Sequence, residues 1–268
     1  MKSKGLTGFQ LKMIGLILMI FDHIHEFFNF GGDIPVAFNW VGRIVAPLFM
    51  FMTVEGFIHT KNRKKYMLRL YIGSLIMSFG NFFLSRYFPR TDSFGLMNNI
   101  FSTLLMITIY LSIVEYFTKA IKEKNIVNMI KGVVLFILPV ALGMIMFMNI
   151  TVPGMMYLLF TIPTPMMVEG GPVFVLLGIV MYLLKEDRKK LVIAYSILSI
   201  LIMFTGDMSI KGLLFRNYQW MMIFSAPLFY LYNGQKGRGM KYLFYVFYPA
   251  HIYVFYCMSV YMMNVLGA

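Results

Sequence analysis

The chain has 268 residues, of which 59% are hydrophobic and 13% are charged, and its formal net charge is +13. An average soluble domain has roughly 25% charged residues, and a water-soluble fold of this size would have too little polar surface to cover so many apolar side chains. The composition therefore excludes a soluble domain, and the meaning of the positive charge depends on where the basic residues lie.

Crossing a bilayer as a helix takes about 20 apolar residues, and nine segments of the sequence meet or approach that length. We therefore predict an all-α integral membrane protein, a polytopic bundle of about nine helices that forms a single domain over residues 1–268. The predicted spans are 10–30, 36–60, 66–88, 98–118, 126–149, 171–185, 190–206, 218–232 and 240–264. The apolar stretch 152–170 is broken by three prolines, which predicts a re-entrant or short helix.

The first predicted span begins at a helix-start pattern. Thr7 and Gln10 have the spacing of a capping box. Basic residues before an apolar stretch resemble a signal peptide, but this stretch contains Asp22 and His23 and has no small-residue cleavage site. We expect it to be retained as a helix.

Lysine and arginine are concentrated in alternate loops, which predicts the orientation in the membrane. Loops rich in lysine and arginine alternate with loops that have few of them through all nine predicted spans. We therefore expect a cytoplasmic N-terminus and a C-terminus on the outside. The positive charge is thus a topology signal and does not predict a nucleic-acid partner. The predicted cytoplasmic residues are Lys2, Lys4, Lys12, Lys61, Arg63, Lys64, Lys65, Lys119, Lys122, Lys124, Lys185, Arg188, Lys189, Lys190, Lys236, Arg238 and Lys241.

Ionisable residues within the predicted spans are candidates for a functional or structural role, because placing each near the bilayer centre costs at least about 2.5 kcal/mol of insertion free energy. Asp22, His23, His25 and Glu26 lie within five residues of one helix. A neutral imidazole at this depth is suited to accept a proton from a nucleophile. The alternative is a structural cluster that faces another helix, with Glu26 at the headgroup level.

Arg43 lies in the second predicted span, which a short loop joins to the first. The two helices must then pack antiparallel, so Arg43 comes within reach of Asp22 or Glu26. A buried arginine needs a carboxylate partner, and a structural pair is the favoured expectation. The alternative is that Arg43 binds a substrate anion or a developing oxyanion.

Glu55, His59 and Arg63 follow one another at intervals of four residues, which predicts one helical face at the cytoplasmic end of the second span. Basic residues continue after them at Lys64, Lys65 and Arg69. A helix end exposed to solvent explains the lysines but not Glu55, which is expected to lie a helical turn or more within the membrane. Such a basic rim would attract a polyphosphate such as the ADP part of coenzyme A.

The last predicted span contains Tyr248, Pro249 and His251, and His251 lies near the depth of His23. The proline bends the helix toward its neighbours. An aromatic stripe is more often packing, whereas a midplane histidine beside a kink is equally compatible with function. The single cysteine, Cys257, excludes an internal disulfide, and no Cys/His spacing predicts a metal site.

Three stretches, 6–24, 42–70 and 218–256, resemble the TraX family, membrane proteins named for N-terminal acetylation of conjugative pilin. More distantly, the chain resembles membrane acyltransferases of the acyltransferase-3 type that modify sugars and cell-wall glycans. The resemblance implies a polar pair at Asp22 and His23, but His25 and Glu26 depart from the family pattern. The other implied site residues are Arg43, Glu55, His59, Arg63, Lys64, Lys65, Arg69, Tyr248, Pro249 and His251.

The hypothesis that follows is a bacterial inner-membrane acyltransferase that uses acetyl-CoA and no metal. The acceptor would be an envelope glycan, lipid or peptide, and the donor's phosphates would bind the basic rim while its pantetheine arm reaches the midplane. His23 would act as general base, Asp22 and Arg43 would orient the site, and His251 would stabilise the oxyanion or transfer a second proton. The alternatives are a transporter or flippase, because midplane charges also mark substrate pathways, and a non-catalytic membrane scaffold.

Overall fold

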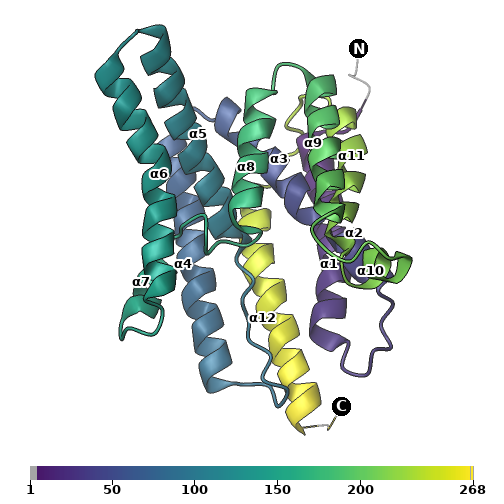
Figure 1. Cartoon of the computed structure of the whole chain (residues 1–268). Coiled ribbons are helices and arrows are strands. Elements are labelled where there is room, and N and C mark those ends of the chain that lie inside the picture. The colour runs from purple at the N-terminus through teal and green to yellow at the C-terminus, as the bar shows by residue number, and fades with distance from the viewer. Residues whose placement is uncertain (1–4, 266, 268) are drawn as a thin grey trace. The chain divides into compact units, whose positions relative to one another are not determined.

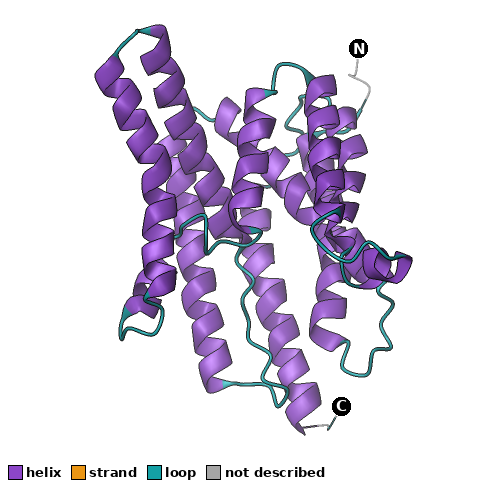
Figure 2. Cartoon of the chain, in the orientation of Figure 1, coloured by secondary structure: helices purple, strands orange, loops and turns teal. Residues whose placement is uncertain are grey.

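The computed structural model describes residues 5–265 and 267, and it is all-helical over that range (Figure 2). Helices make up 74% of it, and the described residues contain no strand. Both facts confirm the predicted all-α class. The basic residues Lys2 and Lys4, and the side chain of Lys241, lie outside what the structure describes.

Most of the predicted spans fold as helices, with boundaries shifted by a few residues (Figure 1). The elements are α1 (Gly8–Phe28), α2 (Ala37–Gly42), α3 (Val45–His59), α4 (Arg63–Tyr87), α5 (Ile100–Lys122), α6 (Ile126–Met148), α7 (Met155–Thr161), α8 (Gly171–Leu183), α9 (Arg188–Met203), α10 (Ile210–Phe215), the 3-10 helix η1 (Tyr218–Ser225), α11 (Ala226–Leu231) and α12 (Lys241–Val265).

Within the described residues, five helices are long and apolar enough to cross a membrane, so the predicted count of nine is not supported. They are Ala37–His59, Arg63–Tyr87, Ile100–Lys122, Ile126–Met148 and Tyr242–Asn264. The remaining predicted spans fall short for identifiable reasons. Helix α1 carries charged residues, α8 and α9 have only 13 and 16 residues, and the segment 218–232 divides into η1 and α11. The orientation of the termini stays a prediction.

Apolar side chains cover the outside of several of these helices. On α6, Val133, Val134, Ile137 and Leu138 are all exposed. An exposed apolar surface of this kind marks an interaction site in a soluble protein, but on a helix of membrane-spanning length it is the surface that lipid covers. The structure therefore supports a lipid bilayer as the surroundings of this chain.

The proline-broken stretch 152–170 contains the short helix α7, which follows Gly154 in the left-handed conformation at φ 86°. After α7 the chain runs through turns to α8, and Gly170 and Gly171 also have positive φ. This irregular backbone agrees with a short helix in the stretch. Whether it enters the membrane stays a prediction.

The chain folds into two compact units. Unit 1 comprises residues 1–52, 83–96 and 184–268, and unit 2 comprises residues 53–82 and 97–183. Helices α3 and α4 each contribute residues to both units. The expectation of a single domain over 1–268 stays a prediction.

In unit 1, helix α1 packs against α2 and α12, and α9 packs against η1 and α11. The N-terminus of α1 has the predicted capping box, in which the Thr7 hydroxyl accepts from the Gln10 backbone N–H and the Gln10 side chain accepts from the Thr7 backbone N–H. Gly15 allows close packing on this helix, because a Cβ there would lie 2.9 Å from the Phe49 ring.

In unit 2, helix α5 packs against both α6 and α8 (Figure 1). Gly178 on α8 allows this approach, because a Cβ there would lie 2.7 Å from the Ile107 side chain. Most of the N-terminal half of α5 is buried, which makes it the central helix of the unit.

A buried arginine in the loop after α4 ties two helices of unit 1 together. Arg90 donates from Nη1 to the Phe27 carbonyl at 3.0 Å and to the Ser259 hydroxyl at 3.2 Å, and so it joins the end of α1 to α12. Its other nitrogens pair with Asp92 at 3.0 and 2.5 Å. Its side chain is only 4% exposed, so each contact replaces water that the guanidinium has lost.

We expect Arg90→Gln to lower the free energy of unfolding by about 3 kcal/mol, the lower end of the range for breaking a buried ion pair. The lower end applies because Asp92 is partly exposed. Thermal unfolding in detergent would measure the change. Arg86→Gln, at an exposed position near the end of α4, is the matched control. An equal effect of both variants would contradict the role of Arg90.

The pH dependence of this contact follows from the Asp92 carboxyl, which lies in the loop between α4 and α5. Its hydrogen bond with Arg90 holds its pKa below the ordinary value of 3.8. The contact therefore adds stability above pH 3.8, and that stability is lost as the pH falls through the lowered pKa. We expect the melting temperatures of the wild type and Asp92→Asn to differ at pH 6 and to converge in stronger acid. A constant difference would show that Asp92 acts without its charge.

Candidate functional site

The polar residues of α1 contact two other helices of unit 1. Asp22 pairs with Arg43, whose Nη2 lies 3.0 Å from Oδ1 and 3.3 Å from Oδ2. This confirms the expected pair. Gly42 makes the approach possible, because a Cβ there would overlap the Asp22 carboxylate.

Arg43 has further partners beyond the carboxylate. Its Nη1 donates to the Gln219 side chain at 3.2 Å, and its Nε donates to the Asn39 carbonyl at 3.2 Å. The Tyr218 ring lies 5.6 Å from the guanidinium carbon. These contacts fix the guanidinium plane, so the Asp22–Arg43 pair joins α1, α2 and η1.

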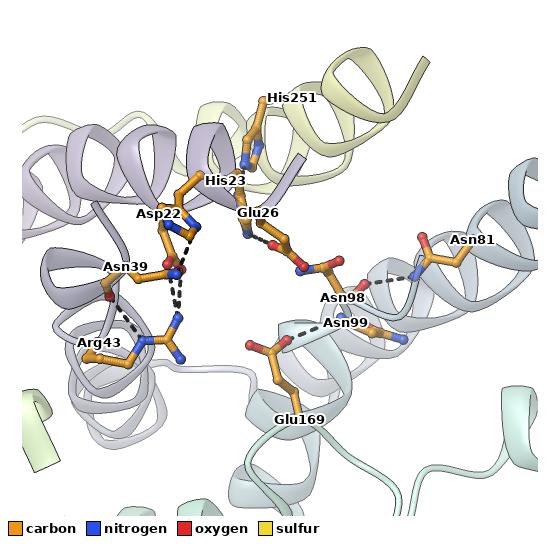
Figure 3. Close-up of polar contacts among 11 residues, drawn as sticks. Asp22, His23, Glu26, Asn39, Arg43, Asn81, Asn98, Asn99, Glu169 and His251 are labelled. Carbon is orange, nitrogen blue, oxygen red and sulfur yellow. Dashed lines mark hydrogen bonds and ion pairs between the residues drawn. The ribbon is translucent and has the colours of Figure 1, made fainter. Parts of the chain in front are cut away.

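Next to this pair, His23 on α1 and His251 on α12 point toward one another (Figure 3). The His23 Nδ1 lies 2.7 Å from the His251 Nε2, and the His251 Nδ1 lies 2.7 Å from the Phe247 carbonyl. A carbonyl only accepts, so His251 carries its proton on Nδ1. The Nε2 of a neutral His251 then accepts, and His23 donates to it from Nδ1.

The remaining nitrogen of His23 faces the next turn of its own helix. His23 Nε2 lies 3.5 Å from the Glu26 Oε2. Both ring nitrogens of His23 therefore have protein groups within reach, and its side chain is only 8% exposed. The Glu26 side chain is 30% exposed.

Aromatic rings enclose the histidine pair on the α12 side. The Phe247 ring stacks on His251 with centroids 4.8 Å apart, and Tyr248 and Phe255 each lie 5.9 Å from it. Tyr248 is buried, as is Ile252 beside it. These rings hold the His251 imidazole in place and keep water from it.

His25 belongs to a different set of contacts. Its Nδ1 lies 2.9 Å from the Asn39 Nδ2, and its Nε2 lies 3.3 Å from the Asn29 Nδ2. Both ring nitrogens of His25 therefore have partners at the polar end of α1 and α2, and these partners are neither His23 nor His251.

In unit 2, the expected single face of Glu55, His59 and Arg63 is wrong. Glu55 and His59 do face each other, at 3.5 Å, but α3 ends at His59 and α4 begins at Arg63. Asn62 starts the new helix, because its side chain accepts from the Lys65 backbone N–H at 2.8 Å. Arg63 is thus on a different helix from the other two residues.

Arg63 instead pairs with Glu115 on α5. Its Nε donates to the Phe57 carbonyl at 3.3 Å, and its guanidinium carbon lies 4.2 Å from the centre of the Phe57 ring. The Tyr182 hydroxyl donates to the other oxygen of Glu115 at 2.5 Å. The positive charge of Arg63 is therefore already matched by a carboxylate.

The rest of the expected basic rim lies on the first turns of α4. Lys64 and Lys65 are exposed, and Arg69 is half-buried with an Nε that has no hydrogen-bond partner among the described residues. Across the described part of the chain, no three His, Cys, Asp or Glu side chains come together as a metal site would require.

A second polar cluster of unit 2 surrounds the start of α5 (Figure 3). The Asn99 backbone N–H donates to the Glu169 carboxylate at 3.3 Å, and the Thr103 hydroxyl donates to the Glu169 carbonyl at 2.8 Å. Asn81 on α4 donates to the Asn98 carbonyl at 2.9 Å. These contacts attach the irregular stretch before α8 to α5.

Sequence reasoning missed Gln219, Glu115 and Glu169 as polar partners. Glu115 could have been found as an acidic residue at a span end beside basic loops, and Glu169 as a carboxylate next to two glycines. Gln219 had no such signal, because its partner Arg43 is 176 residues away in the sequence.

An all-helical chain with five apolar helices of membrane-spanning length, and with an ion pair and a histidine pair inside its helical packing, is a membrane protein. A family model described as TraX protein matches residues 7–259, and the chain belongs to the TraX family.

The chain is also similar to a protein described as "Probable fimbrial assembly protein FimC, serogroup H1" from Dichelobacter nodosus. The two are 29% identical over 257 residues, which cover 92% of this chain and 93% of that protein. No solved structure matches the chain. The predicted family is thus confirmed, whereas the similarity to acyltransferases of the acyltransferase-3 type stays a prediction.

We expect Asp22→Asn and Arg43→Gln each to destabilise the protein, because each leaves a poorly solvated charge without its partner. The double variant should lose less than the sum of the two, with a coupling of roughly 1–3 kcal/mol, as found for residues in direct contact. Unfolding of the four proteins in detergent measures the cycle. Additive effects would show that the ion pair contributes nothing to the fold.

Proposed function

We propose that the chain is a bacterial inner-membrane acyltransferase, which moves an acetyl or similar group from a cytoplasmic CoA thioester to an amine or hydroxyl of the cell envelope. The observation that carries this proposal is the buried pair of His23 and His251. A neutral imidazole in a site with little water is a general base suited to an alcohol or amine nucleophile.

In the proposed reaction, the acceptor attacks the thioester carbonyl and gives its proton to His23, the carbon–sulfur bond breaks, and the departing thiolate takes that proton from His23 to become free CoA. The acceptor's proton passes to the side of His23 that His251 does not occupy. The 2.7 Å contact with His251 fixes the tautomer of His23, as the third group does in other nucleophile–base arrangements. Because both nitrogens of His251 have partners in the structure, this proposal gives His251 a positioning role rather than an oxyanion contact.

Asp22 and Arg43 orient the site in this proposal. Their pair holds α1 against α2, and the partners of Arg43 on η1 prevent it from rotating. Asp22 directly precedes His23 on α1, so a shift of the pair would move the base. Tyr248 contributes by packing against the His251 ring.

The donor's phosphates would bind the basic segment at the start of α4. Lys64 and Lys65 are exposed there, and Arg69 has a buried nitrogen that could donate to an anion. Arg63 is matched by Glu115, so its proposed contribution is to hold the segment in place. Glu55 and His59 stay proposed members of this donor site.

The acceptor classes remain an envelope glycan, a lipid or a peptide. The relative from Dichelobacter nodosus is named as a probable fimbrial assembly protein, which adds a surface-fibre subunit to the peptide class. Mass spectrometry of cell-envelope extracts with and without the protein, searched for the mass that acetylation adds, would identify the acceptor.

We expect His23→Ala to lower the release of free CoA from acetyl-CoA by at least about 100-fold, because a general base contributes roughly 10²–10⁴ in rate. The assay is thiol release by the purified protein with a bacterial envelope extract as acceptor source. His25→Ala is the matched control, since it removes an imidazole from the same helix whose contacts lie elsewhere. Turnover retained in His23→Ala would remove His23 from the mechanism.

Binding of the donor can be measured separately from the reaction, by thermal unfolding of the same two proteins. Acetyl-CoA should raise the melting temperature of both wild type and His23→Ala, since a ligand that binds only the folded state stabilises it. An analogue of acetyl-CoA that lacks the phosphates should not raise the melting temperature of either protein. Proton-driven uptake into liposomes without CoA release would instead support a transporter.

A further inference from the structure

We propose that an apolar groove of unit 2 binds one acyl chain of an anionic phospholipid, whose phosphate group is held by Lys64. This inference goes beyond the proposed function, and none of its tests depends on turnover. It stands on the lining of the groove, on the backbone that forms one of its walls, and on the place of Lys64 at its end.

The groove lies between α4, α5 and the end of α7, and its volume is about 310 Å³. This volume is at the lower end of the range for small-molecule sites. Helix α4 contributes Met67, Leu68 and Tyr71 to the lining, and α5 contributes Leu105 and Ile109. Leu105 is buried and Leu68 is exposed, so the groove opens toward the outer surface of α4.

The end of α7 forms the third wall, and its backbone is suited to an apolar ligand. The Tyr71 hydroxyl donates to the Thr161 carbonyl at 3.0 Å, and the Ile162 backbone N–H donates to the Leu158 carbonyl at 2.7 Å. Pro163 has no backbone N–H that would need a partner. The side chains of Ile162 and Pro163 therefore line the groove without a free N–H beside them.

The depth of the groove matches the acyl-chain region of a bilayer. Helix α4 has membrane-spanning length, and only 22% of its apolar stretch is buried inside the protein. Met67 and Tyr71 lie in its second and third turns, and Leu68 and Ile72 are exposed beside them. The molecule that meets this groove in a membrane is thus a lipid of the bilayer.

Lys64 supplies a positive charge on the same face of α4. At 100° per residue, Met67, Leu68 and Tyr71 all lie within about 60° of Lys64, and Tyr71 is about 10 Å further along the helix axis. Lys64 is exposed, and no carboxylate pairs with it among the residues that the structure describes. A lysine near the membrane surface attracts anionic lipid, so the charge favours a phospholipid with a net negative headgroup.

The proposed donor site shares Lys64 but continues in a different direction. Lys65 and Arg69 lie roughly 100° and 140° around α4 from Lys64, and neither of them lines the groove. A lipid phosphate and a free phosphate would meet the same ammonium group. The apolar surface that continues from Lys64 to Tyr71 decides for the lipid, because a free phosphate leaves it uncovered.

The binding test is native mass spectrometry of the purified protein, titrated with phosphatidylglycerol or with phosphatidylcholine of the same chains. We expect tighter binding of one phosphatidylglycerol, and Lys64→Gln should reduce this preference by about 5-fold, the contribution of one lysine near a membrane surface. Lys131→Gln is the matched control, because Val134, Leu135 and Leu138 follow Lys131 at the same spacing as an exposed face of α6. Equal affinity for both lipids, or an equal effect of both variants, overturns the proposal.

The position of the acyl chain is tested on the wild-type protein by photolabelling. Phosphatidylglycerol with a diazirine in its acyl chain is irradiated with the protein, and the labelled peptides are identified. We expect label at residues 67–71, 105–109 and 161–163 in excess of the exposed face of α6. Label spread evenly over the apolar surface overturns the proposal. Loss of label on addition of glycerol phosphate also overturns it and indicates a site for free phosphate.

Filling the groove tests the same site from the side of the protein. Ile109→Trp and Leu68→Trp each add a ring to the lining, and each should remove most of the photolabel from residues 161–163. Val134→Trp, on the exposed face of α6, is the control and should leave that label unchanged. Unchanged label in both groove variants overturns the proposal, as does a dimer of the wild type that buries the groove and excludes lipid. Where a variant fails to fold, the label on the wild type decides.

Discussion

The pairing of Asp22 with Arg43 is the constraint on which the arrangement of unit 1 depends. A buried charge that loses its partner destabilises a protein by roughly 3–5 kcal/mol, and these two side chains are only 16% and 27% exposed. The cost is offset only if the two helices approach closely, which Gly42 permits by having no side chain. The ion pair thereby fixes how α1 and α2 pack, and with them the position of the next residue, His23.

The histidine pair depends on a second connection. Arg90 holds the last turn of α1 and the Ser259 side chain of α12 together. His251 lies two helical turns before Ser259 on the same helix, so the contact of Arg90 also helps to fix the height of His251 relative to His23. A loop arginine of structural purpose thus supports the geometry that the proposed chemistry needs.

Two carboxylates of unit 2 have hydrogen-bond partners within that unit. Glu115 accepts from both Arg63 and Tyr182, and Glu169 accepts from Asn99 and Thr103. A count of the basic residues therefore overstates the positive charge that is available to bind an anion, because part of that charge is matched by carboxylates. In the basic segment, the lysines on the exposed side of α4 are better candidates for phosphate contacts than the paired Arg63.

The order of the residues was enough to predict the all-α class, the helix start at Thr7, the five helices of membrane-spanning length, the family and a carboxylate partner for Arg43 on the first helix. Each of these follows from short-range patterns, since hydrophobic periodicity and caps act within a few turns and a short loop forces neighbouring helices together. Three features came only from the packing of the helices in three dimensions: α3 ends at His59, several predicted spans are too short to cross a membrane, and His23 contacts His251. The last contact joins residues 228 positions apart, and the partner of a buried polar group is chosen by packing between helices, which local patterns do not encode.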